Sequence, residues 1–138
     1  MMKTRSCIDI KKEWDIVGAR QMGRRTAKEI GFGTVEQARI ATAISELAIN
    51  IYLYSEKGTI CLEFIIKDGE KGIQIIANDQ GPGIKDVHKV LEDGFTTSGG
   101  LGAGLPGVKR LMAEFTITSD DRKGTKVIAI KWLQDFRN

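Results

Sequence analysis

The stretch IATAISELAINIYL, residues 40–53, contains a single formal charge, Glu46, and a single carboxamide, Asn50. Because these two side chains are four residues apart, they lie about 40° apart around a helix axis and share one face. Apolar residues occupy a side that can pack on a sheet: Ile44, Leu47, Ala48 and Ile51. Further apolar residues lie opposite: Ala43, Ile49 and Leu53. The stretch therefore predicts a helix covered on both sides, with one side lining a polar site. The alternative is an exposed glutamate beside an asparagine bonded to a neighbouring turn.

Outward from this helix, apolar periodicity and turn residues predict further elements. The expected helices span residues 13–30, 34–54, 86–92 and 105–114, and the expected strands span 5–10, 59–67, 72–78, 115–119 and 125–133. Gly31 fits the position just after a helix, residues 34–37 fit a capping box, and Asp68 with Gly69 fits a hairpin turn. Because strands joined by short turns pair mostly antiparallel, the order predicts an α+β fold. We expect a two-layer sandwich in one domain, residues 1–138, with helices on one face of a mostly antiparallel mixed sheet.

The composition excludes several classes of protein. The net charge of the 138 residues is 21 − 18 = +3, too small to indicate nucleic-acid binding. No apolar run approaches the ~18 residues of a membrane helix, and the first residues contain no apolar signal-peptide core. With Cys7, Cys61 and His88 as its only cysteines and histidine, the chain cannot form a four-ligand Cys/His zinc site. A disulfide between the cysteines is possible but not implied, and a reducing, cytoplasmic location is expected.

Glycine is concentrated in one part of the chain, because ten of the 16 glycines lie between Gly69 and Gly107. The first group is DQGPG, residues 79–83, directly after an apolar strand. An acid at a strand end, followed by Gly-Pro-Gly, lies at the rim of a crevice, where glycine lets the backbone approach a ligand closely. An ordinary turn is the alternative.

The second glycine group is SGGLGAGLPG, residues 98–107, which leads into a predicted helix. Exposed backbone N–H groups and the positive end of that helix form an anion site, most naturally for phosphates. A loop without a ligand is the alternative. The group also matches the glycine spacing of a dinucleotide fingerprint, but no strand is predicted directly before it, as that motif requires. Gly124 and Thr125, where the last strand begins, are by themselves an ordinary turn-to-strand junction.

In their order along the chain, these motifs resemble the four boxes of the GHKL ATPase/kinase superfamily. Glu46-x-x-x-Asn50 resembles the N box, residues 79–83 the G1 box, residues 100–105 the G2 box, and residues 124–125 the G3 position. Within the superfamily the chain is most similar to the anti-sigma-factor serine kinases, in particular the stressosome switch kinases. Three stretches carry that likeness: EWDIVGAR (13–20), ISELAINIYLY (44–54) and EDGFTTSGGLGAGLPGVKRLM (92–112).

The resemblance implies a role for each matching residue. Glu46 is implied as the general base, Asn50 as the Mg²⁺ ligand, and Asp79 as the acceptor for the adenine amino group. The other nucleotide-binding residues that the resemblance implies are Gly81, Gly83, Gly100, Gly102, Gly104, Leu105 and Thr125. Elementary chemistry agrees with these roles, because Mg²⁺ prefers oxygen ligands and phosphoryl transfer depends on positioning and charge neutralisation.

By the same resemblance, the chain is expected to be a cytoplasmic, ATP- and Mg²⁺-dependent protein serine/threonine kinase of the stress response. Its implied substrates are STAS-domain scaffold and antagonist proteins of a stressosome. By partner switching it would then activate a downstream output protein such as a PP2C-type phosphatase, with no nucleic-acid or membrane partner. Two alternatives stay open: a non-catalytic anti-sigma factor or sequestration module that binds nucleotide, and the catalytic domain of a histidine kinase. The intact Glu46-x-x-x-Asn50 pattern favours the serine kinase over both.

Overall fold

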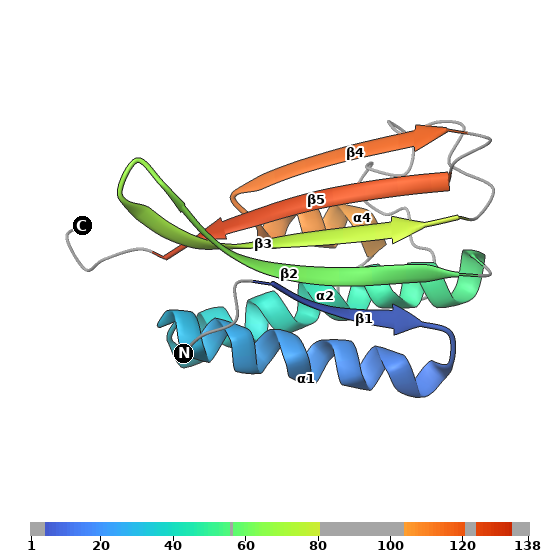
Figure 1. The fold of residues 1–138 in the computed structure, drawn as a ribbon, viewed down its shortest axis with the longest axis horizontal. Helices are drawn as coiled ribbons and strands as arrows, with labels where there is room; N and C mark the ends of the chain where they lie inside the picture. Colours follow the sequence, from blue (N-terminus) through green and yellow to red (C-terminus); the bar gives the residue numbers. More distant parts are fainter. Residues whose placement is uncertain (1–4, 56, 81–103, 121–123, 134–138) are drawn as a thin grey trace.

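The computed structural model describes residues 5–55, 57–80, 104–120 and 124–133 (Figure 1). In chain order, the described elements are β1 (Arg5–Ile10), α1 (Glu13–Ile30), α2 (Thr34–Tyr54), β2 (Gly58–Lys67), β3 (Glu70–Asp79), α4 (Gly104–Leu111), β4 (Glu114–Asp120) and β5 (Gly124–Trp132). The expected helices and strands in these ranges are confirmed, although α4 ends earlier than expected because the chain enters β4 at Glu114. The helix expected at residues 86–92 lies outside the described residues.

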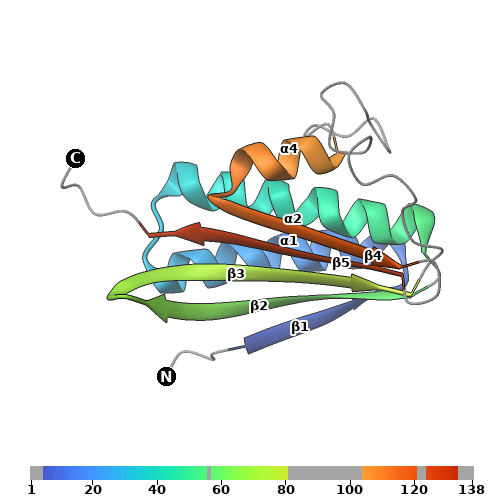
Figure 2. The ribbon, with the colours of Figure 1, turned by 90° about the horizontal axis from the view of Figure 1, so that it is seen from above.

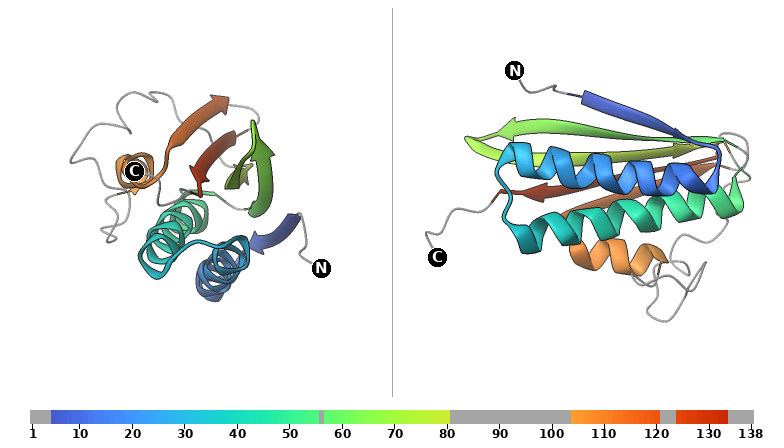
Figure 3. Two further views of the ribbon diagram at one scale, coloured as in Figure 1. Left: turned by 90° about the vertical axis from the view of Figure 1, so that its left-hand side faces the viewer. Right: turned by 90° about the horizontal axis from the view of Figure 1, so that it is seen from below.

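The five strands form one antiparallel sheet in the order β1-β2-β3-β5-β4. Helices α1, α2 and α4 all lie on one face of this sheet, whereas no described element covers the other face (Figures 2 and 3). Helix α2 contacts both α1 and α4 and is the central helix of its layer. The predicted α+β two-layer sandwich is therefore confirmed.

The core lies between the helix layer and the sheet. Its largest fully buried side chains come from both layers: Ile40, Ile44 and Leu47 of α2, and Ile60, Leu62, Ile73 and Ile75 of β2 and β3. Full burial of one such side chain stabilises a fold by ~1.5–3 kcal/mol. The apolar spacing in residues 40–53 is thus satisfied by packing on the sheet and on both neighbouring helices.

Two predicted backbone reversals occur as expected. Asp68 and Gly69 connect β2 to β3 with positive φ angles of 52° and 80°, the left-handed geometry that two-residue hairpin turns require. Gly31 ends α1 in the left-handed region at φ 119°, and its N–H bonds back to the carbonyls of Ala27 and Lys28.

The capping box predicted at residues 34–37 is wrong. Gly33 is the N-cap of α2, with no side-chain cap, and the Gln37 side chain instead donates to the Phe32 carbonyl at 2.8 Å. A carboxylate cap occurs at the start of α1, where Asp15 Oδ2 accepts the N–H groups of Lys11 and Lys12 at 3.0 and 2.9 Å. These backbone hydrogen bonds lower the pKa of the Asp15 carboxyl from its ordinary value.

One lysine connects the sheet to two helices. Lys131 of β5 pairs with Glu36 of α2 at 2.9 Å and donates to the carbonyl of Leu111, the last residue of α4, at 3.0 Å. Glu36 also pairs with Arg39 at 3.1 Å. Because the Lys131 side chain is only 15% exposed, this group of ionic and hydrogen bonds holds the layers together at the end away from β3's carboxyl terminus.

The two cysteines, whose pairing the sequence left open, are joined in the structure. Cys7 of β1 lies directly opposite Cys61 of β2 in the strand register, and a disulfide links them. Within the described residues, no helix is long and apolar enough to cross a membrane.

Candidate nucleotide-binding and phosphotransfer site

The predicted site residues within the described part of the chain converge at one end of the molecule. The carboxyl end of α2, the start of α4, the end of β3 and the start of β5 all lie at this end (Figures 1 and 2). Asp79 is the last residue of β3, Thr125 is the second residue of β5, and Gly104 is the first residue of α4. The fold thus brings together residues that are up to 79 positions apart, from Glu46 to Thr125.

Asp79 is held by the strand beside it. It is directly opposite Thr125 in the β3–β5 register, and Thr125 N–H donates to Asp79 Oδ1 at 3.3 Å. Gly124, just before Thr125, has φ +87°, and a Cβ there would overlap the Asp79 carbonyl oxygen. Gly124 is therefore required both by its backbone conformation and by its contact with Asp79. Gly124 therefore has a specific structural role, whereas its local sequence indicates only an ordinary strand junction.

Ser119 belongs to the same end of the site, although sequence reasoning did not find it. Its hydroxyl lies 3.0 Å from the hydroxyl of Thr125 and 3.5 Å from the Gly124 carbonyl oxygen, to which it donates. Ser119 is directly opposite Thr125 in the β4–β5 register. A serine in a short strand is common, so only this pairing could reveal its position beside Thr125.

Glu46 is buried, with 3% of its surface exposed, which rules out the exposed-glutamate alternative. Its Oε1 accepts a hydrogen bond from the backbone N–H of Gly104 at 2.9 Å. An anion at the first residue of a helix is stabilised by unpaired N–H groups and by the helix dipole. The carboxylate therefore fastens α2 to the start of α4. Asn50, one turn further along α2, is partly exposed.

Helix α4 begins with five buried residues: Gly104, Leu105, Pro106, Gly107 and Val108. Gly104 has φ +69°, a conformation that favours glycine, and Pro106 lies in the first turn as expected. Lys109 and Arg110 lie in the last turn, and both are exposed. The other predicted glycines of the G1 and G2 boxes lie outside the described residues: Gly81, Gly83, Gly100 and Gly102.

The described residues fit a nucleotide with Mg²⁺ by their chemistry. The Asp79 carboxylate, at a partly exposed strand end, is an acceptor matched to an amino group. The amino end of α4 suits phosphate oxygens, and the Asn50 carboxamide oxygen suits Mg²⁺, which keeps waters and phosphate oxygens as its other ligands. In the described part of the chain, no three His, Cys, Asp or Glu side chains are grouped to hold a metal ion.

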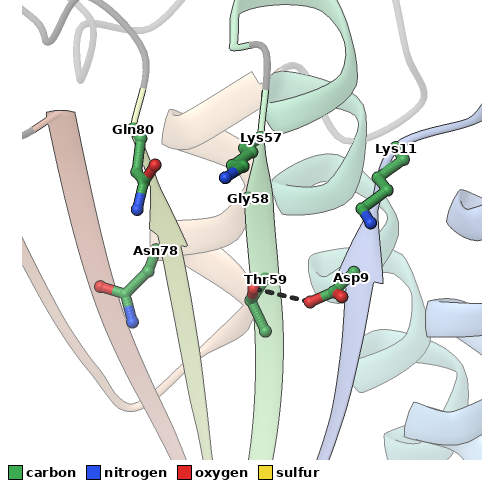
Figure 4. A pocket seen from close by; sticks show the side chains of 7 residues that line it. All are labelled: Asp9, Lys11, Lys57, Gly58, Thr59, Asn78 and Gln80. Atoms are coloured by element: carbon green, nitrogen blue, oxygen red, sulfur yellow. Dashed lines mark hydrogen bonds between the residues drawn. The ribbon is translucent and has the colours of Figure 1, made fainter.

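A polar cavity of about 290 Å³ lies at the same end of the molecule, at the ends of β1 and β3 and the start of β2. Figure 4 shows it on the sheet face opposite the helices, which lie behind the strands in that view. Its lining residues are Asp9, Lys11, Lys57, Gly58, Thr59, Asn78 and Gln80. None of the predicted site residues lines it, so it is separate from the nucleotide site.

Comparisons with known proteins agree with this geometry. The family model for histidine kinase-, DNA gyrase B- and HSP90-like ATPases matches residues 35–135. The chain is 65% identical over 133 residues to the serine/threonine-protein kinase RsbT of Bacillus subtilis (strain 168), covering 96% of this chain and 100% of that protein. It is 36% identical over 107 residues to the anti-sigma F factor of Caldanaerobacter subterraneus subsp. tengcongensis, covering 72% of this chain and 73% of that protein.

A solved structure shares the fold. The mycobacterial sensor histidine kinase MprB superposes with a TM-score of 0.56 at 18% identity, covering 93% of this chain and 97% of that one. At that identity the likeness concerns the fold alone. The family match and the closely similar RsbT confirm the expected superfamily and its serine-kinase branch. This chain belongs to the family of histidine kinase-, DNA gyrase B- and HSP90-like ATPases, the GHKL superfamily.

Proposed function

We propose that this chain is an ATP- and Mg²⁺-dependent protein serine/threonine kinase that phosphorylates STAS-domain scaffold and antagonist proteins of a stressosome. Phosphorylation would release the kinase, which then activates an output protein such as a PP2C-type phosphatase. The proposed catalytic activity rests on one observation, the buried Glu46 carboxylate at the amino end of α4. The similarity to RsbT, named a serine/threonine-protein kinase, extends over nearly all of this chain and supports the same activity.

Recognition of ATP is assigned to the β3–β5 end of the site. Asp79 accepts from the adenine amino group, while Thr125, with Ser119 against its hydroxyl, lies beside the base. Gly81 and Gly83 would let the chain pass close to the base. The amides of Gly100 and Gly102 would bind the phosphates, while Gly104, whose N–H bonds to Glu46, and Leu105 would complete this segment.

Phosphotransfer is assigned to α2. Asn50 would hold Mg²⁺, which neutralises phosphate charge when it is bound. Glu46 has two carboxylate oxygens, and Oε1 accepts the Gly104 N–H. We assign proton transfer to the carboxylate's other oxygen. It removes the proton from the substrate hydroxyl while the hydroxyl oxygen bonds to the γ-phosphorus of ATP and the bond from that phosphorus to ADP breaks. The bond to Gly104 keeps the carboxylate oriented while it does so, as general-base catalysis requires.

Three further statements belong to this proposal. The chain forms one GHKL domain over residues 1–138, which the single described sheet and its core support. It works in the cytoplasm, which the implied stressosome partners support. Neither nucleic acid nor a membrane is among its partners, in keeping with the small net charge of +3.

A non-catalytic anti-sigma or sequestration module of the same fold is the second candidate, because the anti-sigma F factors are also similar to this chain, at 34–36% identity. Incubation with radiolabelled ATP, Mg²⁺ and purified STAS-domain proteins separates the two. Transfer of label to a serine or threonine of the STAS protein supports the kinase. Stable nucleotide binding without any transfer supports the sequestration module.

A further inference from the structure

The cysteine pair lies on a part of the molecule that the nucleotide site does not use. Cys7 is exposed on β1, the edge strand of the sheet, whereas Cys61 on β2 is 4% exposed. The strand register places the two residues directly opposite each other, and a disulfide joins them across this pair of strands. They are the only cysteines of the chain, and any thiol chemistry of the protein is confined to this pair.

We propose that Cys7 and Cys61 form a reversible redox site, which takes a low-molecular-weight disulfide as its oxidant. Disulfides of proteins in reducing compartments are usually transient and redox-sensing. For the cytoplasmic location assigned above, this pair is therefore a switch that opens and closes with the thiol–disulfide balance. The inference goes beyond the kinase activity and rests on the proposed function only through this cytoplasmic location.

The unequal exposure of the sulfurs assigns an order to the exchange. The Cys7 thiolate attacks the small disulfide RS–SR, forms Cys7–S–SR and releases RS⁻. The Cys61 thiolate then attacks the Cys7 sulfur and releases the second RS⁻, which leaves the internal disulfide. In total, two cysteine thiols are oxidised, one RS–SR is reduced to two RSH, and reduced RSH in excess reverses the reaction.

Arg5 supports Cys61 in the second step. Its Nη2 donates to the Cys61 sulfur at 3.6 Å, while its Nη1 pairs with Glu63 at 2.7 Å. A nearby guanidinium favours the thiolate form of a cysteine, the form that attacks a disulfide. The buried Cys61 sulfur thus attacks the mixed disulfide that has already formed on Cys7, so it does not need to reach solvent.

Closure of the bond has one physical consequence for the fold. It joins residues 54 positions apart, and the enclosed segment contains the whole of α1 and α2. A cross-link around so long a segment restricts the unfolded chain and stabilises the folded one. The pair lies on the sheet face opposite the helices, whereas Glu46 and Asn50 lie on α2. Oxidation therefore changes stability without changing nucleotide binding.

The first test follows the exchange by intact mass. The reduced full-length protein is incubated with oxidised glutathione, and the reaction is stopped with an alkylating reagent. The intact mass of the protein is then measured by mass spectrometry. We expect the wild type to lose two hydrogen atoms and retain no adduct, and Cys61→Ser to stop with one glutathione on Cys7. Cys7→Ser should react about tenfold more slowly, because its remaining thiol is buried. A wild type that keeps glutathione on Cys7, or that does not react, overturns the proposal.

The second test compares melting temperatures in oxidised and reduced glutathione. The wild type should melt roughly 5–15 °C higher when oxidised, whereas the Cys7→Ser/Cys61→Ser variant should melt near the reduced wild type in both buffers. ADP affinity should agree within about twofold in all four samples. Equal melting of oxidised and reduced wild type, or a large change in ADP affinity, contradicts the switch as proposed. Neither result bears on whether the protein is a kinase.

Discussion

In the proposed mechanism Glu46 acts in two ways at once, as a structural acceptor and as a general base. Its Oε1 bonds to Gly104 N–H at 2.9 Å, and the carboxylate is 3% exposed. A buried carboxylate without partners is unfavourable by several kcal/mol. The bond to α4 therefore explains how a single charge remains in an otherwise apolar part of α2.

Glu46→Gln separates these two roles. The amide oxygen can still accept from Gly104, so we expect the melting temperature to change little and ADP affinity to stay within a few-fold. Phosphotransfer should fall ~10²–10⁴-fold, because an amide cannot remove the hydroxyl proton. Quantitative label transfer from ATP, beside a thermal melt, measures both. If the folded variant transfers phosphate at the wild-type rate, Glu46 is not the base.

Glu46→Ala is the matched control, because it also removes the bond to Gly104. It leaves a buried N–H without its partner, which typically destabilises by ~1–3 kcal/mol. A lower melting temperature in Glu46→Ala than in Glu46→Gln is the expected sign of that bond.

In the proposed site, Asp79 would select adenine over guanine. Asp79→Asn keeps an oxygen that can accept the Thr125 N–H but replaces a carboxylate that suits the adenine amino group. We expect ADP affinity to weaken by ~1–3 kcal/mol with little change in melting temperature. The wild type should prefer ATP over GTP at least tenfold, about 1.4 kcal/mol, since a carboxylate repels guanine O6. Titration calorimetry with ADP measures the affinity of the variant, and phosphorylation rates with ATP and GTP measure the preference of the wild type. Equal rates with the two nucleotides would exclude Asp79 as the residue that recognises adenine.

At the scale of the element, strand ends and helix starts hold the site. β5 begins at Gly124 against the end of β3, and α1 begins where Asp15 accepts two backbone N–H groups. The first feature joins residues 45 positions apart, whereas the second is local to the start of α1.

Gly124→Ala should disturb both stability and nucleotide binding. A Cβ at φ +87° is strained and overlaps the Asp79 carbonyl, so β3 and β5 must separate at the site. We expect a loss of roughly 1–3 kcal/mol in unfolding free energy and an ADP affinity weakened by more than about tenfold. Gly69→Ala is the control, because Gly69 has φ +80° but nothing within 4 Å of its Cβ position. Normal ADP binding by Gly124→Ala would show that this contact does not position Asp79.

Asp15 gives α1 a defined response to acid. Because the folded state lowers the pKa of Asp15, its contribution to stability is present above the unfolded value near 3.8 and is lost as pH falls through the lower folded pKa. We expect the stability difference between wild type and Asp15→Asn to be constant near neutral pH and to shrink below about pH 4. Urea unfolding across this range measures it. A difference that grows toward acid pH would contradict the cap.

At the scale of the whole molecule, the helix layer and the sheet pack around one core, whose buried positions follow the apolar patterns of the sequence. Lys131 links the two layers at the end away from the candidate site. Lys131 reaches from β5 to Glu36 of α2 and to the last carbonyl of α4. The sheet, α2 and α4 are therefore connected through one ammonium group.

Lys131→Met should loosen this connection while keeping the length of the side chain. We expect a loss of ~1–2 kcal/mol in unfolding free energy, because a largely buried hydrogen-bonded charge is removed and Glu36 keeps only Arg39. Lys126→Met is the control, since Lys126 is exposed on the same strand. Chemical unfolding of both variants is the measurement, and equal stabilities would show that the link contributes nothing.

The local elements were predictable because their signals are local. The apolar spacing of residues 40–53 predicted a helix covered on both sides, and α2 contacts both α1 and α4. Alternation in β2 and the Asp68-Gly69 turn predicted the hairpin that β2 and β3 form. The capping box at residues 34–37 failed, because the segment before α2 could satisfy Gln37 with the Phe32 carbonyl instead. Such competition among nearby hydrogen-bond partners is not encoded in residue spacing.

By itself, the sequence determined the layer architecture, the order of the motifs and the candidate residues Glu46, Asn50 and Asp79. Only the tertiary structure decided which distant atoms meet. Glu46 bonds to Gly104 across 58 positions, Ser119 meets Thr125 through the β4–β5 register, and Cys7 meets Cys61 through the β1–β2 register. Periodicity reports which side of an element is buried, whereas strand register and helix packing are set by the whole core at once. Those contacts therefore emerge only when the complete chain has packed.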